Sequence, residues 1–171
     1  MKIGFHTLLG WVILILQSTV VRYISADAPQ PDLLFLILVW VGFTTPAAVG
    51  LPTALIYGLL QDLFVGGVPG THVFQFVTLY FVMRLMGGRL LLSLKLVQAG
   101  VVAVFTVMGD ALVILCARWV SLPPVAIGAP EVGTPERVLV NVVTALFLFP
   151  LLQGMERRLW PRMGRLPLDV K

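Results

Sequence analysis

Two aspartates in strongly apolar surroundings are the residues whose chemistry calls for an explanation. Asp62 ends a long apolar run and precedes three glycines within five positions, Gly66, Gly67 and Gly70. Asp110 lies about two-thirds of the way along another apolar run. A carboxylate in such surroundings can relay protons or capture a ligand, and it can equally serve as a structural hydrogen-bond acceptor. The sequence leaves these roles open for both residues.

No other group of residues carries a recognisable catalytic or metal-binding pattern. The two histidines, His6 and His72, have no cluster of cysteines or acids beside them, and Cys116 is the single cysteine. The zinc-protease pattern HExxH, the hydrolase pattern GxSxG and the phosphate-binding pattern GxxxxGK followed by Ser or Thr are absent from the sequence. We therefore expect no enzymatic activity, no cofactor and no metal site.

The composition indicates that these residues are held by elements inside a membrane. Hydrophobic residues make up 58% of the 171 residues and charged residues 12%, which is far from the balance of soluble globular domains. Aliphatic runs of roughly twenty residues recur, and no segment alternates apolar and polar residues as a barrel strand would. The sequence therefore predicts an all-α membrane protein with one integral membrane domain over residues 1–171.

The apolar runs predict six transmembrane helices in a compact bundle. The block from Leu33 to Phe64 is broken near its middle by Thr44-Thr45-Pro46, which indicates a helical hairpin. If the block were one kinked span, the loop with Arg84, Arg89 and Lys95 would lie on the outer face, opposite Lys2, so five spans fit the charges less well. The predicted spans cover residues 5–21, 31–44, 46–64, 72–86, 96–117 and 135–152.

Threonine and proline mark the expected starts of two of these helices. Thr45 is the expected N-cap of the span that begins at Pro46, and Thr134 and Pro135 have the same roles in the last span. Residues 31–44 give only about 21 Å of helix at ~1.5 Å per residue, against a hydrocarbon layer of ~30 Å. We expect this helix to begin earlier or to be shielded from lipid by its neighbours.

The distribution of Lys and Arg supports six spans with both termini in the cytoplasm. Short cytoplasmic loops hold an excess of these residues. With the N-terminus inside, nine of the twelve lie on the cytoplasmic side: Lys2, Arg84, Arg89, Lys95, Arg157, Arg158, Arg162, Arg165 and Lys171. We expect the basic tail, residues 155–171, to contact anionic membrane lipid rather than nucleic acid.

The third predicted span carries small residues on one face. Ala47, Gly50, Ala54 and Gly58 recur at steps of three and four, and the next step of four reaches Asp62. Small residues let two helix backbones approach closely, and such packing is a main source of helix association in lipid. We expect this face to pack inside the bundle or against another subunit.

Polar residues elsewhere in the chain are the expected partners of the two aspartates. Asp62 can be held by backbone donors of the glycine turn or by His72, which would make the turn rigid. The candidate partners of Asp110 are a backbone group, Asn141, Thr144 and Gln17.

Three stretches, in combination and order, resemble the rod shape-determining MreD family. They are Pro31-Asp32-Leu33-Leu34, Gly58-Leu59-Leu60-Gln61-Asp62-Leu63 and Gly66-Gly67-Val68-Pro69-Gly70-Thr71-His72. The first span with Gln17-Ser18-Thr19, the chain length, the six spans and the short basic C-terminus extend the resemblance over nearly the whole sequence. None of these stretches is a catalytic signature.

The resemblance implies a non-catalytic component of the bacterial cell-elongation machinery in the inner membrane. Such a component helps to organise lateral peptidoglycan synthesis and cell shape. The implied direct partner is MreC, and the implied indirect partners are MreB filaments, the RodA glycosyltransferase and a penicillin-binding transpeptidase. The implied fold is similar to the substrate-binding subunits of energy-coupling-factor transporters.

That similarity in fold raises an alternative function, a membrane subunit that binds a vitamin-type substrate for transport. Such subunits usually dock their energising partner through two alanines four residues apart on the first helix, and residues 5–21 contain no alanine. A vitamin site would also need aromatic and polar side chains, whereas the loop from Ser121 to Pro135 is mainly Pro, Gly and Ala. These departures favour the scaffold.

Overall fold

The described part of the protein is entirely helical. The computed structural model describes residues 2–17, 19, 30–65, 68–86, 95–119 and 134–159, and no strand occurs among them. Their helices are α1 (Lys2–Leu16), α3 (Leu33–Thr44), α4 (Ala47–Val65), α5 (Thr71–Leu85), α6 (Lys95–Trp119) and α7 (Pro135–Leu159). The predicted all-α class is confirmed.

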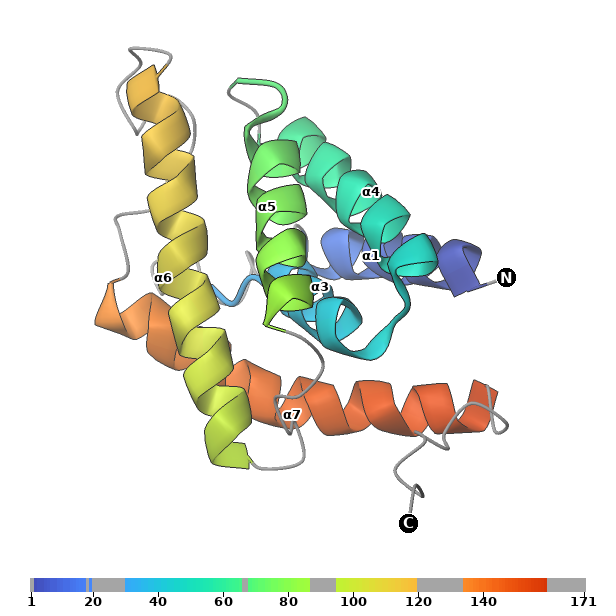
Figure 1. The fold of residues 1–171 in the computed structure, drawn as a ribbon. Helices are drawn as coiled ribbons and strands as arrows, with labels where there is room; N and C mark the ends of the chain where they lie inside the picture. The colour runs from blue at the N-terminus through green and yellow to red at the C-terminus, as the bar shows by residue number, and fades with distance from the viewer. Residues whose placement is uncertain are drawn as a thin grey trace.

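The short helix α3 lies at the centre of the fold. It packs against each of the other five described helices, and its residues from Leu34 to Gly42 are all buried (Figure 1). Its sequence, LLFLILVWVGFT, is apolar on every side, as expected of a helix with no solvent-facing or lipid-facing stripe. The expectation that this helix is shielded by its neighbours is confirmed.

Both ends of α3 are capped by side chains or by backbone bonds. Asp32 is the N-cap, and its Oδ1 accepts a 3.1 Å hydrogen bond from the backbone N–H of Phe35. At the other end the backbone N–H of Thr45 donates to the carbonyl oxygen of Val41 at 3.0 Å. These bonds satisfy backbone groups that the helix itself leaves without partners.

The prediction that Thr45 is the N-cap of α4 is wrong. Thr45 is the C-cap of α3, and its hydroxyl donates to the Val41 carbonyl oxygen at 2.7 Å, so it is not available to α4. Pro46 takes the N-cap position instead, because its carbonyl oxygen accepts the bond from Gly50 N–H at 2.9 Å. The corresponding prediction for the last helix is confirmed: α7 begins at Pro135, and the Thr134 carbonyl oxygen accepts from the backbone N–H of residue 138.

Three of the helices are long and apolar enough to cross a membrane: α4, α6 and α7. Helices α1, α3 and α5 have 15, 12 and 15 residues. At ~1.5 Å per residue these shorter helices measure about 18 to 22 Å, against a hydrocarbon layer of ~30 Å. Six membrane-crossing helices therefore remain a prediction.

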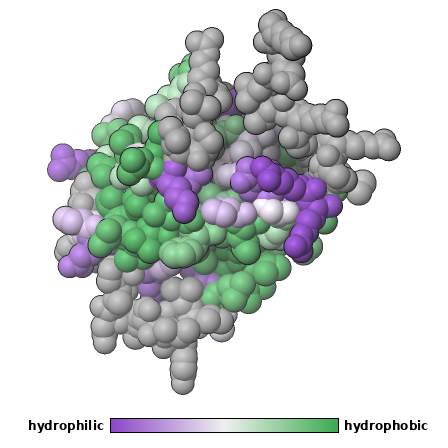
Figure 2. All heavy atoms as spheres, turned by 90° about the horizontal axis from the view of Figure 1, so that it is seen from below, coloured by the Kyte–Doolittle hydropathy of each residue, from purple (hydrophilic) through white to green (hydrophobic). Residues whose placement is uncertain are grey.

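The outer surface of the helices is rich in large apolar side chains. On α7 four of them lie at steps of four residues, with Phe147 76% exposed: Leu139, Val143, Phe147 and Leu151. Seen from below, the molecule presents a broad hydrophobic area with small separate groups of hydrophilic residues around it (Figure 2). A soluble monomer rarely exposes an apolar area of this kind, whereas a helix surface in lipid is expected to.

Candidate functional site

The carboxylate of Asp62, near the end of α4, holds the start of α5. Its Oδ2 accepts hydrogen bonds from the backbone N–H of Gly70 at 2.8 Å and of Val73 at 3.4 Å. Its Oδ1 accepts from the backbone N–H of His72 at 2.8 Å and lies 2.9 Å from Nδ1 of the His72 ring. Asp62 therefore bonds both to the turn and to the histidine, the two partners expected from the sequence.

This arrangement replaces the N-terminal cap that α5 lacks. Gly70 occupies the N-cap position with φ +94°, a conformation that suits glycine, and it has no side chain to offer a capping bond. The first N–H groups of a helix also carry a partial positive charge, which favours a carboxylate there. Asp62 thus caps a helix other than its own and closes the α4–α5 hairpin.

The small residues of α4 face α5 in the same hairpin. A Cβ atom built on Gly58 would lie 2.5 Å from the Val73 Cα, and one built on Gly50 would lie 2.6 Å from the Tyr80 ring. Ala54 between them is fully buried. Gly50, Ala54 and Gly58 therefore pack inside the bundle, which is one of the two roles expected for this face. Gly66 and Gly67 lie outside the described residues.

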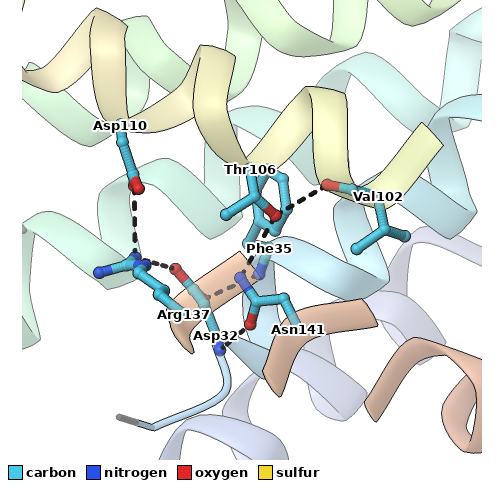
Figure 3. Close-up of polar contacts among 7 residues, drawn as sticks. All are labelled: Asp32, Phe35, Val102, Thr106, Asp110, Arg137 and Asn141. Carbon is cyan, nitrogen blue, oxygen red and sulfur yellow. Dashed lines mark hydrogen bonds and ion pairs between the residues drawn. The ribbon is translucent and has the colours of Figure 1, made fainter. Parts of the chain in front are cut away.

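Asp110 belongs to a second polar cluster, where the starts of α3 and α7 meet α6. Its Oδ1 lies 3.6 Å from Nη2 of Arg137, and the same nitrogen lies 3.7 Å from Oδ2 of Asp32 (Figure 3). The Asp110 side chain is 3% exposed, whereas Arg137 is 26% exposed. One guanidinium therefore lies between two carboxylates that come from two different helices.

Asn141 joins the same cluster through different bonds from those expected. Its Oδ1 accepts from the backbone N–H of Asp32 at 2.9 Å, and its Nδ2 donates to the hydroxyl of Thr106 at 3.4 Å (Figure 3). The Thr106 hydroxyl in turn donates to the Val102 carbonyl oxygen at 2.8 Å. Asn141 thus ties α7 to the start of α3 and to α6.

Arg137 is the central residue of this cluster, and it was not among the candidate partners of Asp110. The predicted helix start at Pro135 places Arg137 inside the first turn of α7. Arg137 and Asn141 are four residues apart and so share one face of that helix. The helical phase from Pro135 is the sequence signal that could have identified Arg137.

Gln17, the third polar residue expected within a span, lies just beyond the end of α1. Its Oε1 atom is buried, and no residue of the described set bonds to it. On the same helix, the carbonyl oxygen of His6 accepts a 2.7 Å bond from the Tyr57 hydroxyl of α4. A built Cβ on Gly10 would lie 2.4 Å from the Tyr57 ring, so α1 and α4 are in close contact there.

The Asp62 cluster and the Asp110–Arg137 cluster can hold helix ends together. Within the described residues, no group of three or more His, Cys, Asp or Glu side chains could hold a metal ion. The Asp62 oxygens are occupied by donors of α5, and the Arg137 guanidinium contacts both acids of the second cluster. Both clusters stand where two or three helices meet.

Comparison with known proteins identifies a family. The model of the family described as rod shape-determining protein MreD matches residues 2–158. No curated protein and no solved structure gives a significant match. The family match covers all six described helices almost completely, and with the long apolar helices it indicates a membrane protein with a role in rod shape determination. The chain belongs to the MreD family of rod shape-determining proteins.

Proposed function

We propose that this protein is a non-catalytic membrane scaffold of the bacterial cell-elongation complex and that it binds MreC. Membership of the MreD family over residues 2–158 is the observation that carries the proposal. The two polar clusters support it, because Asp62 bonds to the start of α5 and Arg137 contacts acids of α3 and α6. Contacts of this kind hold a bundle in one shape, as a scaffold requires.

Through MreC the scaffold would help to organise the enzymes that build the lateral cell wall. Its indirect partners would be MreB filaments, the RodA glycosyltransferase and a penicillin-binding transpeptidase. The protein itself would bind and release no substrate, so its contribution is to keep these partners close to one another in the membrane.

We infer that the protein lies in the bacterial inner membrane as one membrane domain over residues 1–171. It would cross the membrane six times and have both termini in the cytoplasm. Lys95 at the start of α6 and Arg157 and Arg158 near the end of α7 are exposed basic residues on the inferred cytoplasmic side. A bundle similar to the substrate-binding subunits of energy-coupling-factor transporters is part of the same proposal.

The exposed apolar face of α7, defined by Leu139, Val143, Phe147 and Leu151, is the surface we propose for a transmembrane helix of MreC. The small-residue face of α4 is already covered by α5, as the contacts of Gly50 and Gly58 indicate. The α7 face has no such cover among the described helices and extends over more than three helical turns. The Asp62 turn is the second candidate contact.

Bulky substitutions on the α7 face test the docking surface. We expect Val143→Trp combined with Phe147→Trp to reduce the amount of MreC that co-purifies with the protein by at least about tenfold, which corresponds to about 1.4 kcal/mol. Leu55→Trp combined with Leu59→Trp is the matched control, because these residues are exposed apolar positions on α4. Equal recovery of MreC by both variants would contradict the assignment to α7.

A further inference from the structure

Arg84, in the last turn of α5, is an exposed cation with unused hydrogen-bond donors. Its guanidinium donates from Nη1 to the carbonyl oxygen of Thr45 at 3.4 Å. The ion pairs described above involve Asp32, Asp62 and Asp110, and no described carboxylate lies within ion-pair distance of Arg84. A guanidinium has five N–H donors, so most of the hydrogen-bonding capacity of Arg84 is available to a ligand.

The start of α4 lies next to this guanidinium, because Ala47 follows Thr45 by two residues. The backbone N–H of Gly50 donates to the Pro46 carbonyl oxygen at 2.9 Å. The N–H groups of Ala47 and Ala48 precede this bond and have no partner within the helix. Pro46 has no side-chain acceptor to cap them, and both alanines are exposed. Helix α4 therefore begins with free donors and with the partial positive charge of a helix N-terminus.

The Tyr80 hydroxyl is a further donor beside the start of α4. It is buried, and no described residue accepts a hydrogen bond from it. A Cβ built on Gly50, in the first turn of α4, would lie 2.6 Å from the hydroxyl oxygen. Arg84 is close enough to Tyr80 for an electrostatic interaction between them. Donors from three groups thus meet here, and among the described residues only the Thr45 carbonyl oxygen accepts from one of them.

The sum of the nearby charges favours an anion at this place. The ends of α3 and α5 each contribute roughly half a negative elementary charge, and the start of α4 contributes roughly half a positive one. The guanidinium of Arg84 adds a full positive charge, which makes the total positive. The acids of the described clusters do not offset it, because Asp32 and Asp62 lie at the opposite ends of α3 and α5.

Exposed apolar side chains adjoin the same place. Phe81 and Leu85, one helical turn apart on α5, are 51% and 87% exposed, and Leu55 on α4 is 40% exposed. In a membrane protein such side chains face hydrocarbon. A ligand with an anionic head and apolar chains would therefore match both the donors and the surface beside them.

We propose that Arg84 and the N–H groups of Ala47 and Ala48 bind the phosphate of an anionic phospholipid, whose acyl chains lie along Phe81 and Leu85. The topology proposed above places this site in the cytoplasmic leaflet, which is rich in anionic lipid. The site is separate from the α7 face proposed for MreC, and its test in detergent depends neither on MreC nor on the topology.

Lipid binding to the purified full chain in a neutral detergent tests the site. The protein is titrated with phosphatidylglycerol or with phosphatidylcholine that has the same acyl chains, and bound lipid is counted by native mass spectrometry. We expect phosphatidylglycerol to bind at least about tenfold more tightly, because no described acid stands beside Arg84 to pair with a choline group. Equal affinity for the two lipids would overturn the proposal.

Competition with inorganic phosphate separates a lipid site from a site for the free ion. An excess of inorganic phosphate is expected to leave phosphatidylglycerol bound, because the free ion has no chains to contact Phe81 and Leu85. Displacement of the lipid by inorganic phosphate would overturn the assignment to phospholipid.

Two arginine variants distinguish this site from a general attraction of basic residues for anionic lipid. We expect Arg84→Gln to reduce the affinity for phosphatidylglycerol about tenfold, since the charge-assisted bonds to phosphate are lost. Arg157→Gln is the matched control, because Arg157 is another exposed arginine in the last turn of its helix, α7. We expect it to bind the lipid as the natural protein does. An equal loss in the two variants would overturn the site.

Ala47→Asp tests the part of α4 without weakening the helix. A carboxylate in the first turn favours the helix and repels a phosphate. We expect at least about a fivefold loss of affinity for phosphatidylglycerol, with an unchanged or higher unfolding temperature in detergent free of lipid. This variant decides the question even where Arg84→Gln fails to fold. Undiminished lipid binding by folded Ala47→Asp would overturn the proposal.

Discussion

The carboxylate of Asp62 contacts both the backbone and the side chain of His72. Its Oδ1 accepts from the backbone N–H at 2.8 Å and lies 2.9 Å from the ring Nδ1. Both side chains are 8% exposed, so water competes little for these bonds. A single residue on α4 thereby fixes where α5 begins and how the hairpin is closed.

Replacing Asp62 is therefore expected to loosen the α4–α5 hairpin. Asp62→Ala leaves the backbone N–H groups of Gly70 and His72 without their acceptor, at a cost of about 2 kcal/mol in the free energy of unfolding. Asp62→Asn keeps one acceptor oxygen and is expected to lose less than Asp62→Ala. Chemical unfolding in detergent measures both, and equal stability of Asp62→Ala and the natural protein would refute the capping role.

Gly58 is expected to be intolerant of any side chain. A methyl group at this position would meet backbone atoms of Val73 and His72 at 2.5 to 3.0 Å, and backbone cannot move aside as a side chain can. Gly58→Ala should then separate α4 from α5 and cost about 2 kcal/mol.

Gly100 supplies the matched control for Gly58. It lies within α6 with no atom near its built Cβ, so Gly100→Ala is expected to leave stability unchanged or to raise it by up to about 1 kcal/mol. Thermal unfolding of the two variants in one detergent gives the comparison. If both substitutions had the same effect, the close approach of α4 and α5 would be in doubt.

Two buried tyrosines are expected to respond in opposite ways to loss of the hydroxyl. The Tyr57 hydroxyl donates to the His6 carbonyl oxygen at 2.7 Å, so Tyr57→Phe should cost about 1 kcal/mol. The Tyr80 hydroxyl is buried and has no hydrogen-bond partner in the described part of the chain. Tyr80→Phe should therefore be neutral or stabilising, and a loss larger than that of Tyr57→Phe would contradict the assignment.

Arg137 and Asp110 are expected to be energetically coupled. Arg137→Leu leaves Asp110 buried without this counter-ion and should cost about 2 to 3 kcal/mol, less than for a fully buried pair because Arg137 is partly exposed. Asp110→Asn combined with Arg137→Leu should cost less than the sum of the two single variants. A double-mutant cycle on unfolding free energies measures this coupling, and strictly additive effects would rule it out.

Local chemistry made the Asp62 contacts predictable, whereas contacts between distant helices were predicted poorly. Asp62 and His72 are ten residues apart across a glycine-rich turn, so few geometries are open to them. Arg137 and Asp32 are far apart in the sequence, and no local pattern predicts that their side chains contact each other. Asn141 was recognised as polar and intramembrane, but its partners are Asp32 and Thr106, which lie on other helices.

Helix boundaries show the same division between local signals and the fold. Thr134 and Pro135 begin α7 as predicted, and the Thr134 carbonyl oxygen accepts the helical bond from the backbone N–H of Val138. Thr45 stands between two helices, and its hydroxyl bonds backward to α3 rather than forward to α4. Hydropathy alone does not decide between those two choices, since both flanking segments are apolar.

The most direct test of the scaffold is to identify the proteins that this chain holds in native membranes. The tagged full-length protein is extracted in mild detergent, captured, and analysed with its partners by mass spectrometry, with an unrelated tagged membrane protein of similar abundance as control. The account predicts enrichment of MreC together with enzymes of cell-wall synthesis. Enrichment of a pair of ATPase subunits without MreC would contradict it and would favour a transporter subunit.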